Sequence, residues 1–261
     1  MPKVLTKCAT VGAFTLLAAH AAAQTDSETA PASKTGRFEL KRQNTARGTP
    51  NETSATTLRA ERYFDGPIAM LRLDLPFPDE KTDFAGSPFQ PRPGDLKARL
   101  RFRSWQTGAF AFSPFAELTF PTADPESLGK GKYQLSAGLR AVTPVLLPML
   151  EASAHHSTFE FEVQQTNSVA GDPAFKDVNN TKFEFTLFDT WQKTYTFKVK
   201  LKPTVDWVQN GRTGANAEIE GGANFARDWR WWLMLGARAW GPSGIANTYQ
   251  TRVELGLNYT Y

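Results

Sequence analysis

The chain has 261 residues, and its 30 Lys and Arg against 26 Asp and Glu give a formal net charge of +4. This near balance argues against nucleic acid as a partner, because proteins that bind nucleic acid concentrate a clear basic excess. The single cysteine excludes a disulfide within the chain and a cysteine-ligated metal site. After the N-terminal segment, no stretch approaches the roughly 20 apolar residues of a membrane helix.

The first 23 residues have the layout of a secretory signal peptide. Lys3 and Lys7 precede an apolar run over residues 11–19, and small residues follow up to Ala23, where cleavage is expected. A lipoprotein signal built on Cys8 is excluded, because Lys7 directly precedes the cysteine and no apolar region lies upstream of it. Cleavage would remove the cysteine and two lysines, which leaves a net charge of about +2.

Residues 24–35, QTDSETAPASKT, are polar and low in apolar content, so we expect a flexible periplasmic leader. The remainder, residues 36–261, is predicted to be one domain. It shows no sustained helical periodicity, and clusters of Gly, Pro, Asn and Asp separate its apolar segments at near-regular intervals. This distribution favours an all-β chain.

The strands are predicted from alternation, because side chains at i and i+2 share one face of an extended chain. Basic residues alternate with apolar ones over 96–103 and 195–202, and glutamates do so over 217–225. In chain order the predicted strands are 37–41, 56–67 with its tight turn, 68–75, 96–103, 108–120, 131–142, 148–163, 182–188, 195–202, 217–225, 229–240 and 249–261.

Two features favour a transmembrane barrel over a soluble β-sandwich, which also alternates. Many of the predicted strands reach about ten residues, whereas strands of globular proteins are usually nearer six. The connections also alternate in length. They are tight near residues 106, 147, 190 and 228, long at 76–94, 121–130 and 164–181, and intermediate at 210–214 and 241–246. Outer-membrane barrels have short periplasmic turns on one rim and longer loops on the other.

The tryptophans agree with this arrangement. Five of them lie at or beside a predicted tight turn: Trp105, Trp191, Trp229, Trp231 and Trp232. The other two, Trp207 and Trp240, lie at the opposite ends of their strands. Outer-membrane barrels have aromatic girdles at both interfaces. We therefore predict an antiparallel transmembrane β-barrel of about 12 strands, with ten as the alternative, in lipid of the bacterial outer membrane.

The segment TRVELGLNYTY supports the same location. Its apolar face, extended back to Tyr249, includes Tyr259 and Tyr261, and its polar face includes Arg252 and Glu254. An aromatic residue at the end of an alternating strand resembles the signal by which the outer-membrane assembly machinery recognises its clients. We therefore expect that machinery to be a partner.

The polar faces of the strands form ladders of alternating sign that we predict to line the lumen. Such ladders could form a polar conduit that selects among solutes, or could pair across strands and fill the lumen. A barrel of this size is only slightly wider than one filled by side chains. The candidate residues are Lys97, Arg99, Arg101, Arg103, Glu160, Glu162, Glu184, Lys198, Lys200, Lys202, Glu218 and Glu220.

One pattern points weakly to catalysis. His155 and Ser157 share a strand face, as in some outer-membrane lipid deacylases that have His-x-Ser on a strand and an acid on the next. A Ser–His pair needs hydrogen-bond contact and a third group that orients the histidine, and the sequence assigns no such acid. Residues 128–133, LGKGKY, lack the phosphate-loop spacing, and no His and carboxylate cluster has metal-ligand spacing. We therefore predict no enzyme and no cofactor.

Residues 115–141 resemble a family of outer-membrane barrels linked to the meta-pathway of phenol degradation. These proteins tend to have Gly-Asp before a strand, a strand that ends in Pro-Thr, and Leu-Gly-x-Gly before the next strand. Here 94–95, 121–122 and 128–131 occupy those places, although Ala123 stands where the family often has Gly. The resemblance extends over residues 56–261 and implies a barrel that handles aromatic or other hydrophobic small molecules. It identifies no binding residues.

The leading hypothesis for function is a narrow channel or transporter for small, aromatic or hydrophobic solutes. The alternatives are a structural or surface-interaction barrel with a packed lumen, and a lipid hydrolase that uses Ser157 and His155.

Overall fold

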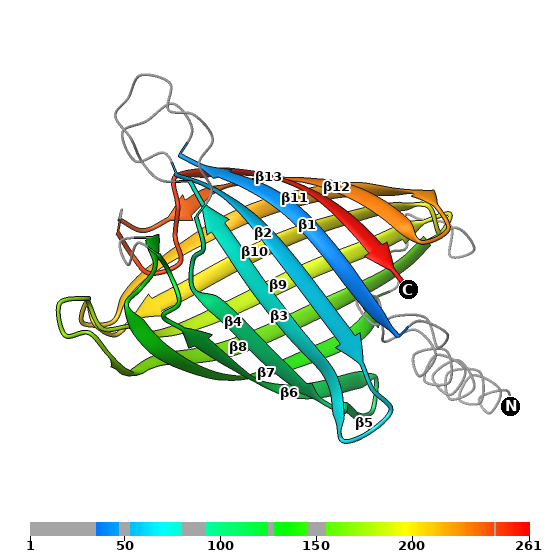
Figure 1. Ribbon diagram of the computed structural model, residues 1–261. Helices are drawn as coiled ribbons and strands as arrows, with labels where there is room; N and C mark the ends of the chain where they lie inside the picture. The colour runs from blue at the N-terminus through cyan, green and yellow to red at the C-terminus, as the bar shows by residue number, and fades with distance from the viewer. Residues whose placement is uncertain (1–34, 47–52, 80–91, 125–127, 146–154, 243) are drawn as a thin grey trace, which may run out of the picture.

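The computed structural model describes residues 35–46, 53–79, 92–124, 128–145, 155–242 and 244–261. The predicted signal peptide and residues 24–34 of the predicted leader lie outside this part and stay predictions. The described residues form strands and the turns between them (Figure 1). None of their helices is long and apolar enough to cross a bilayer.

Thirteen strands follow one another in the described part of the chain. They are β1 (Gly36–Thr45), β2 (Thr53–Tyr63), β3 (Ile68–Pro78), β4 (Leu96–Phe102), β5 (Trp105–Thr107), β6 (Phe110–Phe120), β7 (Lys132–Val145), β8 (His155–Gly171), β9 (Asn179–Trp191), β10 (Tyr195–Asp206), β11 (Arg212–Ala226), β12 (Trp229–Trp240) and β13 (Thr251–Thr260).

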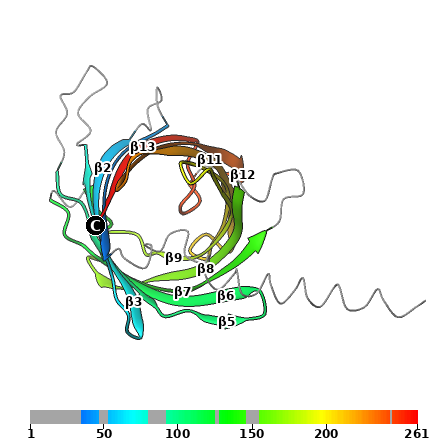
Figure 2. The same cartoon turned by 90° about the vertical axis from the view of Figure 1, so that its right-hand side faces the viewer.

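Antiparallel pairing closes these strands into a barrel. Strand β13 pairs with β1, and β6 pairs with both β4 and β5. Because β4 and β5 occupy one position in the wall, the barrel has 12 strands (Figure 2). The predicted antiparallel barrel of 12 strands is confirmed, and the alternative of ten strands is wrong.

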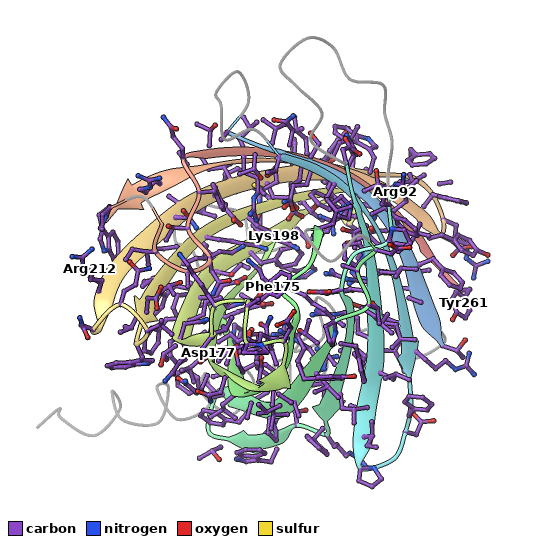
Figure 3. The ribbon with its side chains drawn as sticks, turned by 60° about the vertical axis from the view of Figure 1, so that its left-hand side comes forward. Arg92, Phe175, Asp177, Lys198, Arg212 and Tyr261 are labelled. Carbon is purple, nitrogen blue, oxygen red and sulfur yellow. The ribbon has the colours of Figure 1, made fainter. Side chains whose placement is uncertain are left out.

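The barrel has two unlike rims. The tight-turn rim contains the turns at residues 64–67, 192–194 and 227–228, together with the start of β1 and the end of β13. At this rim the Thr35 amide donates to the Tyr261 carbonyl oxygen at 2.7 Å, which fastens the seam between β13 and β1. The loop rim contains the connections after β1, β3, β6, β8, β10 and β12. Figure 3 places Arg212, at the loop rim, on the opposite side of the view from Tyr261.

The outer face of the barrel is apolar, as contact with lipid tails requires. Leu235 and Leu255 are each 55% exposed although they lie in mid-strand. At the tight-turn rim, Trp229 packs against Tyr259 with ring centroids 4.9 Å apart, and Tyr261 stacks on Phe38 at 5.2 Å. The closed barrel and its apolar exterior belong in the bacterial outer membrane.

One predicted connection differs from the structure. Strand β8 continues to Gly171, so the predicted long loop at 164–181 shrinks to residues 172–178. The extension was missed because its residues 164–168 are polar on both faces, and it nonetheless pairs with β7. The start of the predicted strand 148–163 and the tight turn near residue 147 lie in residues 146–154, outside the described part.

Two aromatic residues that were expected on the outer face are turned inward. Trp232 was expected in a girdle but is only 6% exposed, and its ring lies over Gly256 on the lumen side. Tyr249 was predicted to share the apolar face of β13. It lies instead before the strand begins, in the connection 241–250, and its hydroxyl donates to Glu218. Period-two reasoning fails there because the chain is not extended.

Candidate functional site in the barrel lumen

Charged side chains occupy the inward-facing positions of most strands. The register pairs Lys198 with Glu220 and Lys200 with Glu218, so ladders of opposite sign lie side by side on β10 and β11. Apolar residues alternate with these positions and face outward, because a charged side chain on the lipid face of a barrel costs about 2–4 kcal/mol at mid-membrane.

Many of these charges form ion pairs across the strands. The Lys198 ammonium lies 3.3 Å from a Glu220 carboxylate oxygen, and the Lys202 ammonium lies 2.6 Å from Glu218. On the other side of β10, Lys200 lies 3.7 Å from Glu184. The basic ladder of β10 is therefore held between Glu184 on β9 and the acidic ladder of β11, in the acid–base–acid order expected from the sequence.

Arg99 on β4 connects strands that are not neighbours in the wall. Its Nε lies 2.8 Å from a Glu117 carboxylate oxygen on the neighbouring β6, and its Nη1 lies 3.4 Å from Glu162 on β8. The guanidinium also lies 4.3 Å from the centre of the Phe115 ring. Because β4 and β8 are separated by β6 and β7 in the wall, Arg99 reaches across the interior.

The structure brings eleven of the twelve candidate residues to lumen cavities. These are Lys97, Arg99, Arg101, Glu160, Glu162, Glu184, Lys198, Lys200, Lys202, Glu218 and Glu220. Arg103 differs, because it is exposed and lies in the break between β4 and β5 at the tight-turn rim. Its backbone amide donates to the Pro67 carbonyl at 2.8 Å. Alternation ends at Phe102, beside a register shift in the β3–β4 pairing, so the extrapolation to Arg103 fails.

Further lumen residues were missed by sequence reasoning. They come mainly from β1, β2, β3 and β13, and include Arg37, Glu39, Lys41, Arg59, Arg72, Asp74, Arg230, Arg252 and Glu254. The signal was present as alternation in RFELK and in LRAERY, where charged residues recur every second position. The signal was weaker than in the ladders of β4 or β10 because both segments are short and LRAERY has Arg62 on its outer side.

Two adjoining cavities extend along the lumen. The larger, about 500 Å³, reaches Lys130, Val178 and Asn247 at the loop rim. The second, about 280 Å³, reaches Arg37 and Asn258 near the tight-turn rim. Seven residues line both cavities, and we call them the junction: Lys41, Gln43, Arg59, Arg72, Arg99, Lys182 and Arg252. The cavities thus follow one another from one rim toward the other.

The cavities lie unevenly across the barrel. Near the tight-turn rim the cavity of about 280 Å³ borders β12, β13 and β1, and we call these three strands the open wall. Strands β6 to β9 form the packed wall, where the inward rings of Phe115 and Phe188 are 4% and 5% exposed. Small cavities of about 50 and 30 Å³ lie beside Arg140 there, whereas toward the loop rim the cavity of about 500 Å³ also borders β6 to β9. Near the tight-turn rim the path is therefore narrow and lies to one side.

The connection 241–250 narrows the mouth at the loop rim. The Asn216 side-chain amide donates to the Asn247 carbonyl at 2.8 Å, and the Ala246 amide donates to the Asp206 carboxylate at 3.1 Å. The Tyr249 hydroxyl donates to Glu218 at 2.5 Å. Burial, followed by the Glu218 charge, raises the pKa of Tyr249 above its ordinary value, so the phenol stays protonated. Figure 2 shows this segment inside the ring of strands.

His155 and Ser157 do have an acid between them, Asp189 on the adjacent β9. The Ser157 hydroxyl donates to one Asp189 oxygen at 2.6 Å, and His155 Nδ1 lies 2.9 Å from the other. A hydrolase triad requires the histidine between serine and acid, so that it can accept the serine proton. Here the carboxylate stands in the middle, and the group faces outward at the tight-turn rim, where His155 stacks on Trp191.

No group of three or more His, Cys, Asp and Glu among the described residues is placed to hold a metal ion.

Comparison with known proteins identifies the fold. No family model matches the chain, and no curated protein is significantly similar to it. Several solved barrels match over most of the chain. The outer-membrane channel from Pseudomonas putida F1 has a TM-score of 0.60 at 13% identity and covers 89% of this chain and 97% of its own. The KdgM porin has a TM-score of 0.56 at 10% identity, with 86% and 99% covered. The NanC porin has 0.56 at 6% identity, with 87% and 100% covered.

Proposed function

We propose that the protein is a narrow outer-membrane channel for small solutes. The observation that carries the proposal is the pair of adjoining cavities, of about 500 and 280 Å³, which share the junction residues and together approach both rims. A structural barrel has no need for a water-sized path along its axis. The fold, which is that of porins and channels of the outer membrane, supports the same function.

The lining favours polar solutes. The larger cavity is bordered mostly by Lys, Arg, Gln, Thr and Asn side chains, with Ala55, Pro76, Val178 and Ala246 as its apolar members. A neutral hydrophobic solute would have to displace water from these groups without replacing their hydrogen bonds, which is unfavourable. An aromatic solute fits best in ionised form, such as a carboxylate. The link to phenol degradation stays a prediction.

The packed-lumen alternative accounts for one side of the barrel only. Phe115, Phe188 and Arg140 fill the space beside the packed wall, as that alternative requires. On the open wall Trp232 and Met234 also point inward, at 6% and 4% exposure, yet a cavity of about 280 Å³ remains beside them. We therefore expect a pore that excludes large solutes and admits small ones.

Liposome swelling tests this function directly. Refolded protein is inserted into liposomes, and the rate of swelling is measured with polar solutes of increasing size. We expect entry of the smallest solutes and a sharp loss of rate as size increases, because the smaller cavity holds only about 280 Å³. Swelling equal to that of protein-free liposomes for every solute would contradict the channel and favour the packed barrel.

The hydrolase hypothesis lacks the required geometry, because Asp189 bridges Ser157 and His155. We expect Ser157→Ala to leave the lipid composition of the outer membrane unchanged, as measured by mass spectrometry of extracted lipids.

A further inference from the structure

We propose that the junction makes the channel selective for anions, and that its solutes are small carboxylates. This inference rests on the channel function proposed above, since selectivity requires a conducting path. It concerns the charge of the solute, which neither the fold nor the fold comparison determines.

The first observation is an excess of positive charge in the lining. The described residues around the four lumen cavities include fifteen Lys and Arg but ten Asp and Glu. The excess is not spread evenly. The cavity at the loop rim has eight basic residues and two acidic ones. A solute that enters from the loop rim therefore meets a strongly positive chamber first.

The second observation is the composition of the junction. Six of its seven residues are basic and the seventh is Gln43, so no carboxylate borders both cavities. Narrow passages with low-dielectric walls concentrate the field of the charges that line them. Rings of Arg and Lys favour anions in pores for this reason. Every solute that passes between the cavities must pass these six cations.

The carboxylates next to the junction hold its arginines in place. Arg59 donates to Asp74 through Nε at 2.6 Å and lies 3.2 Å from Glu39. These acids are among the most buried polar residues, at 7% and 6% exposure. They fix the Arg59 guanidinium group and are less exposed than it is, with the side chains of Glu39 and Asp74 at 6% and 10% against 18%. Arginine presents a planar set of donors that matches a carboxylate, so the solute would be recognised in the same geometry.

The third observation concerns two lysines at the loop-side cavity. Lys97 and Lys130 both border it and both are exposed. Within the described part of the chain, no carboxylate lies within ion-pair distance of either one, in contrast to Lys198 and Lys202. Their ammonium groups are therefore available to attract an incoming anion. Their charge is also the easiest to remove, because no ion pair with a buried acid would be broken among the described residues.

Ion selectivity of the whole chain in planar bilayers tests the inference. Single-channel currents are recorded across a KCl gradient, and the reversal potential gives the permeability ratio of chloride to potassium. We expect chloride to be preferred several-fold. Replacement of chloride by acetate or benzoate should leave an anion current, since both carry the proposed carboxylate.

Charge removal at the loop-side cavity supplies the matched comparison. In Lys97→Gln/Lys130→Gln the preference for chloride should fall, and in Lys97→Glu/Lys130→Glu it should fall further. Lys193→Glu is the control, because Lys193 is exposed in the tight turn between β9 and β10 and borders none of the described cavities. It should leave the ratio unchanged. Insertion of each variant is checked by its heat-dependent gel shift.

The outcomes separate the two proposals. A ratio near one, or a preference for potassium, in the unmodified protein would overturn the inference and leave the channel intact. If the permeability ratio is unchanged in both charge variants, Lys97 and Lys130 do not contribute to selectivity, and the proposed effect of the positive cavity at the loop rim is wrong. Absence of any conductance would overturn the channel and its selectivity together.

Discussion

The open wall and the packed wall face one lumen, yet they leave very different amounts of space. On the packed wall, Phe115, Arg140 and Phe188 project inward, and the cavities beside them measure about 30 and 50 Å³. On the open wall, β13 presents Gly256 near its middle, and the Trp232 indole lies against it. A cavity of about 280 Å³ remains in front of the indole.

This difference shows that strand number alone does not set the width of the path. Both walls belong to the same 12-stranded ring. A few inward positions decide whether the space is filled, because small barrels are only just wide enough for side chains to close them. Substitutions at those positions should therefore widen the lumen beside the packed wall or narrow it beside the open wall.

The largest effect is expected at the seam that closes the open wall. Deletion of Tyr261 removes the hydrogen bond from the Thr35 amide at 2.7 Å and the stacking on Phe38. It also removes the aromatic end of β13. We expect most of the protein to be lost from the folded, membrane-inserted fraction, as measured by the heat-dependent gel shift.

Tyr195→Ala is the control for the seam, since Tyr195 is another exposed aromatic residue at the tight-turn rim. Equal assembly of the deletion and the unmodified protein would show that the seam closes without Tyr261.

The next largest effect is expected on the packed wall. Phe115→Ala empties a site that is 4% exposed and removes the ring next to Arg99. We expect the free energy of unfolding to fall by about 3 kcal/mol, as for other buried phenylalanines. Conductance should rise, because the freed volume joins the small cavity beside Arg140. Leu118→Ala, at an outward position of the same strand, should leave conductance unchanged, and a closed lumen in Phe115→Ala would contradict our account of the packed wall.

The opposite change should narrow the open wall. A methyl group at Gly256 would overlap the Trp232 indole, so Gly256→Ala must push the ring into the cavity. We expect lower conductance and a loss of about 1–2 kcal/mol in stability, typical of overpacking. Gly221→Ala is the matched control, because a methyl group there meets nothing within 4 Å. Identical conductance of the two variants would show that Trp232 does not border the path.

The smallest effect is expected at the mouth. Because its folded-state pKa is raised, Tyr249 keeps its proton at a pH where the unfolded chain ionises, at about 10. Its stabilising effect is therefore complete below that pH and is lost as the pH rises further. We expect Tyr249→Phe to cost about 2 kcal/mol at pH 8, the range for a hydrogen bond to a charged group. The difference in free energy of unfolding between Tyr249→Phe and the unmodified protein, measured by urea unfolding, should be smaller at pH 11. A difference that does not change with pH would contradict the assigned hydrogen bond.

The barrel could be predicted because its signal is repeated in every strand. Alternation over segments such as 96–103 and 195–202, together with the unequal connections, was sufficient for the fold and for its closure as 12 strands. The same reasoning placed Lys97 and Lys198 on inward faces. It failed at Arg103 and Tyr249, where the chain leaves the extended conformation and the period of two no longer applies.

The uneven lumen could not be predicted. Whether Trp232 lies along the wall or across the path depends on Gly256, its neighbour on the next strand, and that contact requires the register of β12 with β13. The reach of Arg99 to Glu162 likewise depends on how far apart β4 and β8 lie in the closed ring. Strand register and ring geometry depend on how the strands pair, and neither can be predicted from the alternation of residues in one sequence.

The seam between β1 and β13 also sets an order of events during folding. Thr35 and Tyr261 are 226 positions apart, whereas the other strands pair with near neighbours in the chain. Contacts between distant positions form slowly because the intervening loop must first be closed. The hairpins can therefore form early, and the ring closes last. Until then the edges of β1 and β13 each carry a row of unsatisfied backbone groups, which the bilayer interior does not tolerate, so insertion and closure must be coupled.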